Sequence, residues 1–387
     1  MQKIVRAITS ASLCALLLAC PASGKQRAAS GEDEFNPAVG DSPDSAPPLA
    51  HLSAALHGED IARAMRKVGD WELKRTRKHF DQDWTFAAMY AGFMAASETL
   101  PGSRYESAML GMGKKFGWQL GPRQSHADDQ AIGQTYLALY HRHPHPGMIA
   151  PLRKQLDALI KLPDDPNHPV WWWCDALFMA PRVWAGLARE TGERSYLDYM
   201  DREWWITSGL LYDSGEHLYS RDATFLHKQE ANGRKIFWAR GNGWVLAGLA
   251  RVLEVMPDDY PSRPRYVEQF RQMAARVSGL QGGDGLWRPG LLDEAAYPLP
   301  EVSGSAFFIY AIAWGVNHGI LERKDYLPLL ERGWAGILAH VFEDGRLGCI
   351  QPVGAAPGAF KPTSSYVYGV GAFLLAGAEL QRLAGPR

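Results

Sequence analysis

Asp175 is the first residue whose type and surroundings suggest chemistry. It follows three tryptophans and a cysteine in the stretch VWWWCDALFMAP, and the residues after it have the composition of an apolar helix. A carboxylate at a helix N-terminus can cap free backbone N–H groups, which is the structural interpretation. An apolar setting also raises the pKa of a carboxyl group, and an acid that stays neutral can donate a proton. Asp175 is therefore a candidate general acid as well as a candidate helix cap.

Two further carboxylates, Asp128 and Asp129, lie in the stretch SHADDQAIGQTYLALY. Ser125 stands three residues before Asp128, which is the spacing of a helix capping box and gives one of the pair a structural explanation. Neighbouring helical residues point about 100° apart, so at most one of the two aspartates is expected to face a given site. If the fold brings this helix start close to Asp175, two carboxylates in different environments can divide the acid and base roles.

Tryptophan and arginine side chains could bind a sugar beside these carboxylates. The sequence has 14 tryptophans, and Trp173 and Trp244 lie at expected helix starts. An indole ring can stack on the C–H face of a sugar, although rings of this size also fill the core of a large helical protein. Arg240, in FWARGNGWVLAGL, could bind a carboxylate or a row of hydroxyl groups, or could pair with a neighbouring acid. The clustering of tryptophans beside polar groups favours a sugar site.

Metal and cofactor chemistry is not predicted. Prolines space His141, His143 and His145 in HRHPHP as expected for a surface turn, and the sequence has no C-x-x-C or H-E-x-x-H pattern. Beyond the first 20 residues only Cys174 and Cys349 remain, which argues against a disulfide framework. The formal net charge of -1 gives no reason to expect attraction to nucleic acid or to an anionic membrane surface. No protein partner is predicted.

The elements that must position these residues are helices. From about residue 55 onwards, apolar residues recur at helical spacing, as in Leu246, Leu249 and Leu253. Turn sequences such as LPGS and MPDDYPSRP separate most of the helices, and short connections imply antiparallel neighbours. Helices are expected to begin near Ile61, Trp84, Tyr105, Ala127, Gly147, Asp175, Tyr196, Gly241, Arg265, Ser303, Asp325 and Ser364.

Twelve helices in antiparallel pairs make six helical hairpins. We expect the hairpins to close into an all-α (α/α)6 barrel over residues 51–387, because the sequence lacks the fixed-period repeat of an open solenoid. Three stretches break the helical pattern, 213–240, 281–300 and 343–362; the first two are expected to be long loops with short strands. Long loops on a rigid scaffold commonly carry binding groups.

The N-terminus is typical of an exported protein. MQKIVRAITSASLCALLLAC has a basic start and an apolar run too short to span a bilayer, which predicts a signal peptide over residues 1–20. Small residues before Cys20 resemble a bacterial lipoprotein processing site, although Leu18 is less usual there and plain secretion is the alternative. Residues 21–50 are rich in Pro, Ser, Gly and Ala, which indicates a flexible linker. We expect a periplasmic protein with a lipid anchor at Cys20.

Four stretches together carry a family resemblance. WWWCDALFMAP, DDQAIGQTYLALY, FWARGNGW and EVSGSAFFIYAIAWGV resemble glycoside hydrolase family 105, the unsaturated rhamnogalacturonyl hydrolases, and more distantly family 88, the unsaturated glucuronyl hydrolases. The similarity extends over roughly residues 55–385 and implies an (α/α)6 barrel. It also implies release of a terminal 4,5-unsaturated uronic acid from lyase-generated oligosaccharides of the rhamnogalacturonan or pectin type. Protonation of C4 and hydration at C5 would accomplish this without a metal or cofactor.

The resemblance also implies roles for individual residues. Asp175 matches the general acid and base of the family, and Asp128 matches its second aspartate, with Asp129 possible after a shift of one residue. Positions that line the substrate pocket of the family match Trp173, Arg240 and Trp244. Where many members carry a histidine after the seventh helix, this chain has Arg221, with His217 four residues earlier. Arg221 could supply charge for the substrate carboxylate, or could signal a different uronide or leaving sugar.

Two other functions stay open from the sequence. A hydrolase could use two carboxylates on saturated glycosides, in which case it would act on undigested polymer without loss of a double bond. A sugar-binding lipoprotein on the same barrel would retain oligosaccharides and convert none of them. The paired aspartates argue against pure binding only through the resemblance.

Overall fold

The computed structural model describes residues 38–162 and 169–385 of the 387-residue chain. The predicted signal peptide, Cys20 and the part of the expected linker up to residue 37 lie outside the described residues. Helices make up most of the described chain, and the four strands have two residues each.

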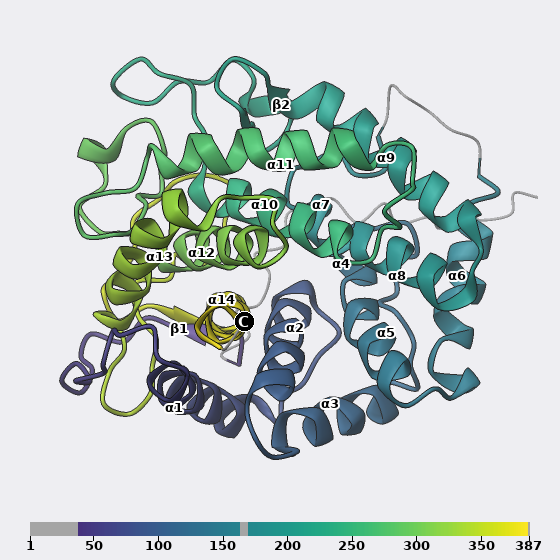
Figure 1. The fold of residues 1–387 in the computed structure, drawn as a ribbon, viewed down its shortest axis with the longest axis horizontal. Helices are drawn as coiled ribbons and strands as arrows, with labels where there is room; N and C mark the ends of the chain where they lie inside the picture. The colour runs from purple at the N-terminus through teal and green to yellow at the C-terminus, as the bar shows by residue number, and fades with distance from the viewer. Residues whose placement is uncertain (1–37, 163–168, 386–387) are drawn as a thin grey trace, which may run out of the picture. The chain divides into compact units, whose positions relative to one another are not determined.

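Six helical segments form an inner ring. Each contacts the next one along the chain, and the last packs against the first, which closes the ring (Figure 1). The inner segments are α2 (Trp84–Thr99), α4 with α5 (Ala127–Gln130 and Gly133–Arg142), α7 with α8 (Ala176–Met179 and Pro181–Thr191), α10 (Ala239–Leu253), α12 (Val302–Asn317) and α14 (Val367–Ala384).

Six outer helices return the chain between the inner ones. In Figure 1 they surround the ring, with α1 outside α14 and α11 outside α10. The expected (α/α)6 barrel is therefore confirmed, with helix starts close to all the predicted positions. The outer helices are α1 (Gly58–Thr76), α3 (Arg104–Lys115), α6 (Ala150–Leu159), α9 (Arg194–Leu211), α11 (Arg263–Ser278) and α13 (Arg323–Leu338).

The inner helices are apolar on nearly every side because they pack both within the ring and against the outer layer. In α12 every residue from 302 to 316 is buried, whereas α1 buries one face that includes Ile61, Met65 and Val68. The α7–α8 segment is broken at Pro181, which lacks the N–H needed to continue the helix. A Cβ on Gly371 of α14 would lie 2.3 Å from the Ala88 carbonyl oxygen, so glycine permits the close approach of α14 to α2.

Residues 38–50 pack against the barrel, which corrects the expectation of a flexible linker for this part of the chain. β1 (Gly40–Asp41) pairs antiparallel with β4 (Ser365–Tyr366), and Asp41 forms an ion pair with Arg346. The Ala50 N–H donates to the Val341 carbonyl oxygen at 2.8 Å. Composition alone missed this because backbone pairing with a strand more than 300 residues away leaves no signal in a Pro- and Ser-rich stretch.

The long loops differ in their strand content. The first contains the hairpin of β2 (Tyr212–Asp213) and β3 (Leu218–Tyr219), as expected for short strands. The second has a single bridge, between Gly290 and Trp238, and a 3-10 turn at Glu294–Ala296, so the expectation of a regular strand there is wrong. Across the described ranges, the helices are each too short or too polar to cross a membrane.

Candidate active site

The starts of the inner helices meet at one end of the barrel, which we call the Asp175 end. Trp84 at the start of α2 stacks on Tyr368 at the start of α14, with ring centroids 5.4 Å apart. The Arg240 guanidinium, at the start of α10, lies 4.9 Å from the same Tyr368 ring. Side chains that precede or begin the inner helices are therefore neighbours here, and the predicted carboxylates are among them.

Asp175 is placed by an extended stretch that pairs with the loop after β3. Trp173 forms an antiparallel bridge with Asp222, and the Cys174 N–H donates to the Arg221 carbonyl oxygen at 2.8 Å. Asp175 then directly precedes α7, but its side chain accepts no hydrogen bond from that helix, so the helix-cap interpretation is wrong. Its Oδ2 instead lies 3.5 Å from Arg221 Nε.

The protonation of Asp175 depends on opposing influences. Burial raises the pKa of the Asp175 carboxyl, while the positive charges of Arg221 and Arg240 work in the opposite direction, and the net shift is upward. A Cβ on Gly241 would lie 3.1 Å from Cys174 Sγ and 3.7 Å from Asp175 Oδ1. Glycine at this position therefore lets the first turn of α10 approach the carboxyl closely, as the sequence indicated.

The two adjacent aspartates of α4 have different partners. Asp129 is buried and held by Arg123, whose backbone N–H and Nη2 both donate to its carboxylate at 2.6 Å. Asp128 instead has His126 Nδ1 at 3.5 Å from its Oδ2. Burial and the negative charge of Asp175 raise the pKa of Asp128 to about 7. Asp128 is thus the aspartate that interacts with Asp175.

The predicted capping box at the start of α4 is not formed. The N-cap position is His126, and no side chain caps the helix there. Asp128 is consequently free of the structural role that its spacing from Ser125 suggested, which leaves its carboxyl available to the site.

Trp172 and His126 are site residues that the sequence interpretation missed. Trp172 is 46% exposed, although Trp171 and Trp173 on either side of it are buried. Its ring lies 4.6 Å from that of Trp173 and 5.4 Å from the Arg221 guanidinium, and the His126 ring lies 4.8 Å from Trp173. Side chains alternate in an extended stretch, so this alternation was the signal that could have identified Trp172 as the ring facing solvent.

Arg240 does not present its donors to a ligand in this structure. The side chain is fully buried, and its Nη1 and Nη2 donate to the carbonyl oxygens of Gln351 and Pro352, both at 2.7 Å. The guanidinium lies between the rings of Trp238, at 4.4 Å, and Tyr368. Arg240 therefore holds the 343–362 loop against the barrel. It influences Asp175 through its positive charge, which lowers the pKa of that carboxyl.

Trp244 and His217 also do not lie where residues that line a substrate pocket are expected. Trp244 is buried and packs on Phe178 and Phe307, with ring centroids 4.7 and 4.2 Å away, so it belongs to the core beneath the site. His217 lies in the turn between β2 and β3, where its Nδ1 is 3.0 Å from the Tyr212 hydroxyl. That hydroxyl donates to Gln272 of α11, so the contacts of His217 are with the outer layer.

The arrangement can protonate a bound sugar and orient an anionic one. Asp175 and Asp128 are carboxyls whose pKa values are both raised, and Arg221 and the exposed Trp172 ring lie beside them. Within residues 38–162 and 169–385, no three His, Cys, Asp or Glu side chains are grouped to hold a metal ion. The histidines of the HRHPHP turn instead include two that pair with glutamates, His141 with Glu190 and His143 with Glu106.

Comparison with known proteins agrees with this geometry. Residues 59–384 match the model of Glycosyl Hydrolase Family 88. The chain belongs to this family. An unsaturated 3S-rhamnoglycuronyl hydrolase of Formosa agariphila is 40% identical to this family 88 hydrolase over 352 residues, which are 86% of the present chain and 93% of the relative.

Two further proteins extend the comparison. A protein of the same name from Alteromonas sp. (strain LOR) is 33% identical over 329 residues, 80% of each chain. The solved structure of a glycosyl hydrolase family 88 protein from Bacteroides vulgatus superposes with a TM-score of 0.80 at 28% identity, covering 84% of this chain and 99% of that one. The predicted resemblance to unsaturated uronyl hydrolases is confirmed, and the protein is a glycoside hydrolase.

Proposed function

We propose that this family 88 hydrolase releases a terminal 4,5-unsaturated uronic acid, with Asp175 as the proton donor and Asp128 as its partner. The observation that carries the proposal is the pair of carboxyls at the Asp175 end, both with a pKa raised from the usual range. A carboxyl with an unperturbed pKa of about 3.9 would be almost wholly ionised near neutral pH and could not donate a proton. The site supplies a neutral acid by burying both groups next to each other.

The proposed reaction moves one proton onto carbon and adds one water. The Asp175 carboxyl protonates C4 of the C4=C5 enol ether, and the positive charge that develops at C5 is shared with the ring oxygen. Water then adds at C5 while a carboxylate of the pair, Asp175 or Asp128, takes its proton. The hemiketal formed at C5 opens, the neighbouring sugar is released, and the anomeric carbon undergoes no direct displacement.

Arg221 and Trp172 form the side of the site that we assign to binding. The Arg221 guanidinium donates to Asp222 Oδ2 through Nη1 at 2.6 Å, and its buried Nε lies 3.5 Å from Asp175 Oδ2. The positive charge of this guanidinium can attract an anionic group, and a planar exposed indole offers a face for a sugar ring. We propose that Arg221 binds the carboxylate of the uronic acid or a sulfate of the adjacent sugar.

We further propose that the sugar released is a rhamnose with a sulfate at O3. Two relatives, at 40% and 33% identity, carry the name unsaturated 3S-rhamnoglycuronyl hydrolase, and each is covered over most of its length. Rhamnose is also the neighbour in the rhamnogalacturonan substrates implied by the sequence motifs. The two substrate classes therefore differ in the sulfate, whereas both place rhamnose beside the unsaturated residue.

A substrate panel tests the proposed function. Purified protein is incubated with unsaturated oligosaccharides derived from ulvan, pectin and glycosaminoglycans, including sulfated and desulfated forms of the same rhamnose-containing disaccharide. We expect the ultraviolet absorbance of the double bond to fall, fastest with the sulfated disaccharide. A lyase would increase this absorbance, and a binding protein would leave it unchanged. Unchanged absorbance with every member of the panel would rule the proposal out.

Export with a lipid anchor at Cys20 is proposed from the sequence alone. The basic and apolar leader followed by small residues before Cys20 supports it. Incorporation of labelled palmitate into the wild-type protein, but not into a Cys20→Ser variant, is the expected result. Equal labelling of both would contradict the anchor.

A further inference from the structure

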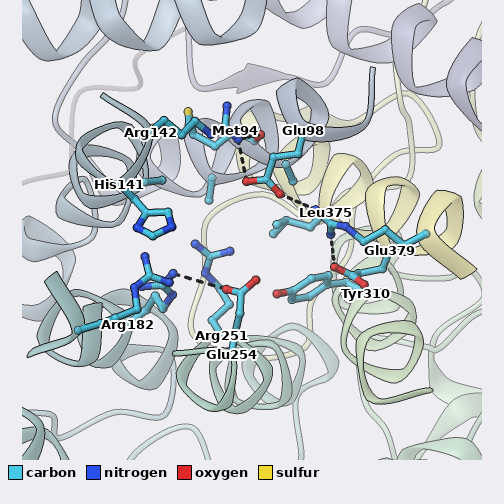
Figure 2. Close-up of a pocket in the computed structure, with 15 residues that line it drawn as sticks. Met94, Glu98, His141, Arg142, Arg182, Arg251, Glu254, Tyr310, Leu375 and Glu379 are labelled. Carbon is cyan, nitrogen blue, oxygen red and sulfur yellow. Dashed lines mark hydrogen bonds and ion pairs between the residues drawn. The ribbon is translucent and has the colours of Figure 1, made fainter. Parts of the chain in front are cut away.

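A cavity lies at the opposite end of the barrel, which we call the Arg182 end. Its volume is about 220 Å³, and its lining comes from the inner helices α2, α5, α8, α10, α12 and α14. Figure 2 shows that charged side chains of these helices surround a common space. No lining residue of this cavity belongs to the active site described above.

Two acidic side chains of the cavity already have cationic partners. Glu98 accepts a hydrogen bond from Arg142 at 2.7 Å and also pairs with Arg382. Glu379 pairs with Arg382 as well. The carbonyl ends of the inner helices carry partial negative charge, which accounts for arginines in their last turns. These groups are therefore balanced without a ligand.

Arg182 is not explained in this way. It is the second residue of α8, where the positive end of the helix dipole disfavours a cation. Its side chain is only 9% exposed, and both Nε and Nη1 are buried without a hydrogen-bond partner. The remaining nitrogen, Nη2, is 3.5 Å from Glu254 Oε2, the outer limit of a hydrogen bond. Burial lowers the pKa of Arg182 to about 10, which shows how poorly its charge is compensated.

Arg251 adds a second guanidinium to the same space. Its Nε donates to Gln134 Oε1 at 2.7 Å, and the guanidinium borders the cavity together with Tyr310. In Figure 2 Arg251 points towards the space that Arg182 and Glu254 also border. Two arginines on different helices are thus arranged around one cavity. The positive charges of both act on the carboxylate of Glu254.

We propose that this cavity binds a small oxyanion of the sulfate or phosphate type between Arg182 and Arg251. The fork of a guanidinium matches the geometry of two oxygens of such an ion, and the Arg182 guanidinium, two of whose nitrogens lack a hydrogen-bond partner, carries the positive charge that would attract it. A water molecule occupies about 30 Å³ of liquid volume, so the cavity has room for one ion and a few waters.

Binding would join helices that the cavity separates. Arg182 lies on α8 and Arg251 on α10, and Gln134 of α5 connects Arg251 to the carbonyl oxygens of Phe178 and Met179 at 2.8 and 3.1 Å. An ion held between the two guanidinium groups would therefore stabilise three inner segments against unfolding. A ligand that binds only the folded protein raises its melting temperature in a saturable way.

Thermal unfolding of the full-length protein tests this site. Sulfate and phosphate are titrated in separate series, with sodium chloride at matched ionic strength as the reference. We expect a saturable rise of the melting temperature in the wild type. Arg182→Met and Arg251→Gln should each weaken the apparent affinity by about tenfold or more. Arg63→Gln is the matched control because this arginine is 63% exposed on α1, and its titration should equal that of the wild type.

The variants separate specific binding from the general stabilising effect of sulfate. Exclusion of sulfate from the protein surface would raise all four melting temperatures alike, so identical titrations of wild type and variants would overturn the proposal. If either variant does not fold, a crystal soaked in selenate gives an independent answer. An anomalous peak within hydrogen-bond distance of Arg182 supports the site, and its absence contradicts it. A response to either ion supports the site, and the tighter ion identifies its ligand.

Discussion

At the Asp175 end of the barrel the negative charge of one acidic side chain acts on another, whereas at the Arg182 end each acidic side chain has a guanidinium partner. Burial together with the charge of Asp175 raises the pKa of Asp128 to about 7. Although burial acts on Glu254 in the same direction, the charges of Arg182 and Arg251 hold the pKa of Glu254 below its usual value. Burial alone therefore does not decide the protonation of a carboxyl in this barrel; the balance of the positive and negative charges around it does.

The arginines at the Asp175 end are largely committed to other partners. Both Nη groups of Arg240 donate to backbone carbonyl oxygens, and the Arg221 guanidinium pairs with both Asp175 and Asp222. Hydrogen bonds from Thr224 and Arg221 outweigh burial and hold the pKa of Asp222 low, so Asp222 stays ionised and keeps part of the Arg221 charge. The positive charge left for Asp175 and Asp128 is too weak to bring their pKa values down to the usual range. The pair therefore keeps a protonated carboxyl, which is the state that proton donation requires.

The largest effect is expected from Asp175→Asn. The amide keeps the shape of the side chain and removes the acid, so kcat/KM should fall by about a hundredfold to ten-thousandfold. Initial rates of double-bond loss measure the effect, and thermal unfolding shows whether the variant is folded. Asp157→Asn on α6, at a half-exposed carboxylate of the outer layer, is the matched control and should retain activity. Turnover close to that of the wild type in Asp175→Asn would exclude it as the proton donor.

Arg221→Gln should have a smaller effect with a diagnostic pH dependence. The Arg221 charge lowers the pKa of Asp175, so its loss raises that pKa and keeps the acid protonated to higher pH. The alkaline limb of the activity profile should move upward, while loss of an anion contact reduces kcat/KM by about tenfold to a hundredfold.

Arg221→Lys distinguishes the two contributions of this side chain. It keeps a positive charge near Asp175 and should leave the alkaline limb close to that of the wild type, although the fork-shaped contact is lost. An unmoved limb in Arg221→Gln combined with a raised KM would mean that Arg221 binds substrate without tuning Asp175.

Local pattern was sufficient to predict the barrel. Apolar residues at helical spacing and short turns located the helices, because an inner helix must be apolar on nearly all sides and an outer helix on one. The N-terminal segment was misassigned for the opposite reason. Its pairing of Gly40 with Tyr366 depends on a strand at the far end of the chain, which no local window contains.

In the candidate site, too, local pattern predicted some features, whereas others depend on residues far away in the sequence. The angle between neighbouring helical residues predicted that only one of Asp128 and Asp129 faces the site, but the choice depends on where Arg123 folds back. The residues around Arg240 in the sequence suggested that it contacts a ligand. Its guanidinium instead donates to backbone carbonyl oxygens of the loop that contains Gln351, more than 100 residues away, which local composition does not reveal.

The smallest effects, and the most direct test of the two ends, come from stability as a function of pH. The folded-state pKa of Asp128, about 7, lies above the ordinary aspartate pKa of 3.8, so ionising it destabilises the folded protein as pH rises between these values. Asp128→Asn should therefore raise the melting temperature at pH 8 by about 2–6 °C, and the difference should vanish near pH 4. Calorimetry or fluorescence at a series of pH values measures it.

Glu254→Gln should show the opposite sign at the other end. Its folded-state pKa is lowered, so the ionised carboxylate contributes stability at pH values above the ordinary glutamate pKa of 4.5, and this stability is lost as pH falls through the folded-state pKa. The variant should melt about 1–3 °C below the wild type at pH 8, a smaller change because the side chain is 39% exposed and screened by solvent. The two sites share no partner, so their effects should add in the double variant and partly cancel at pH 8. The same sign for both single variants would show that burial, and not the balance of nearby charges, governs these carboxyls.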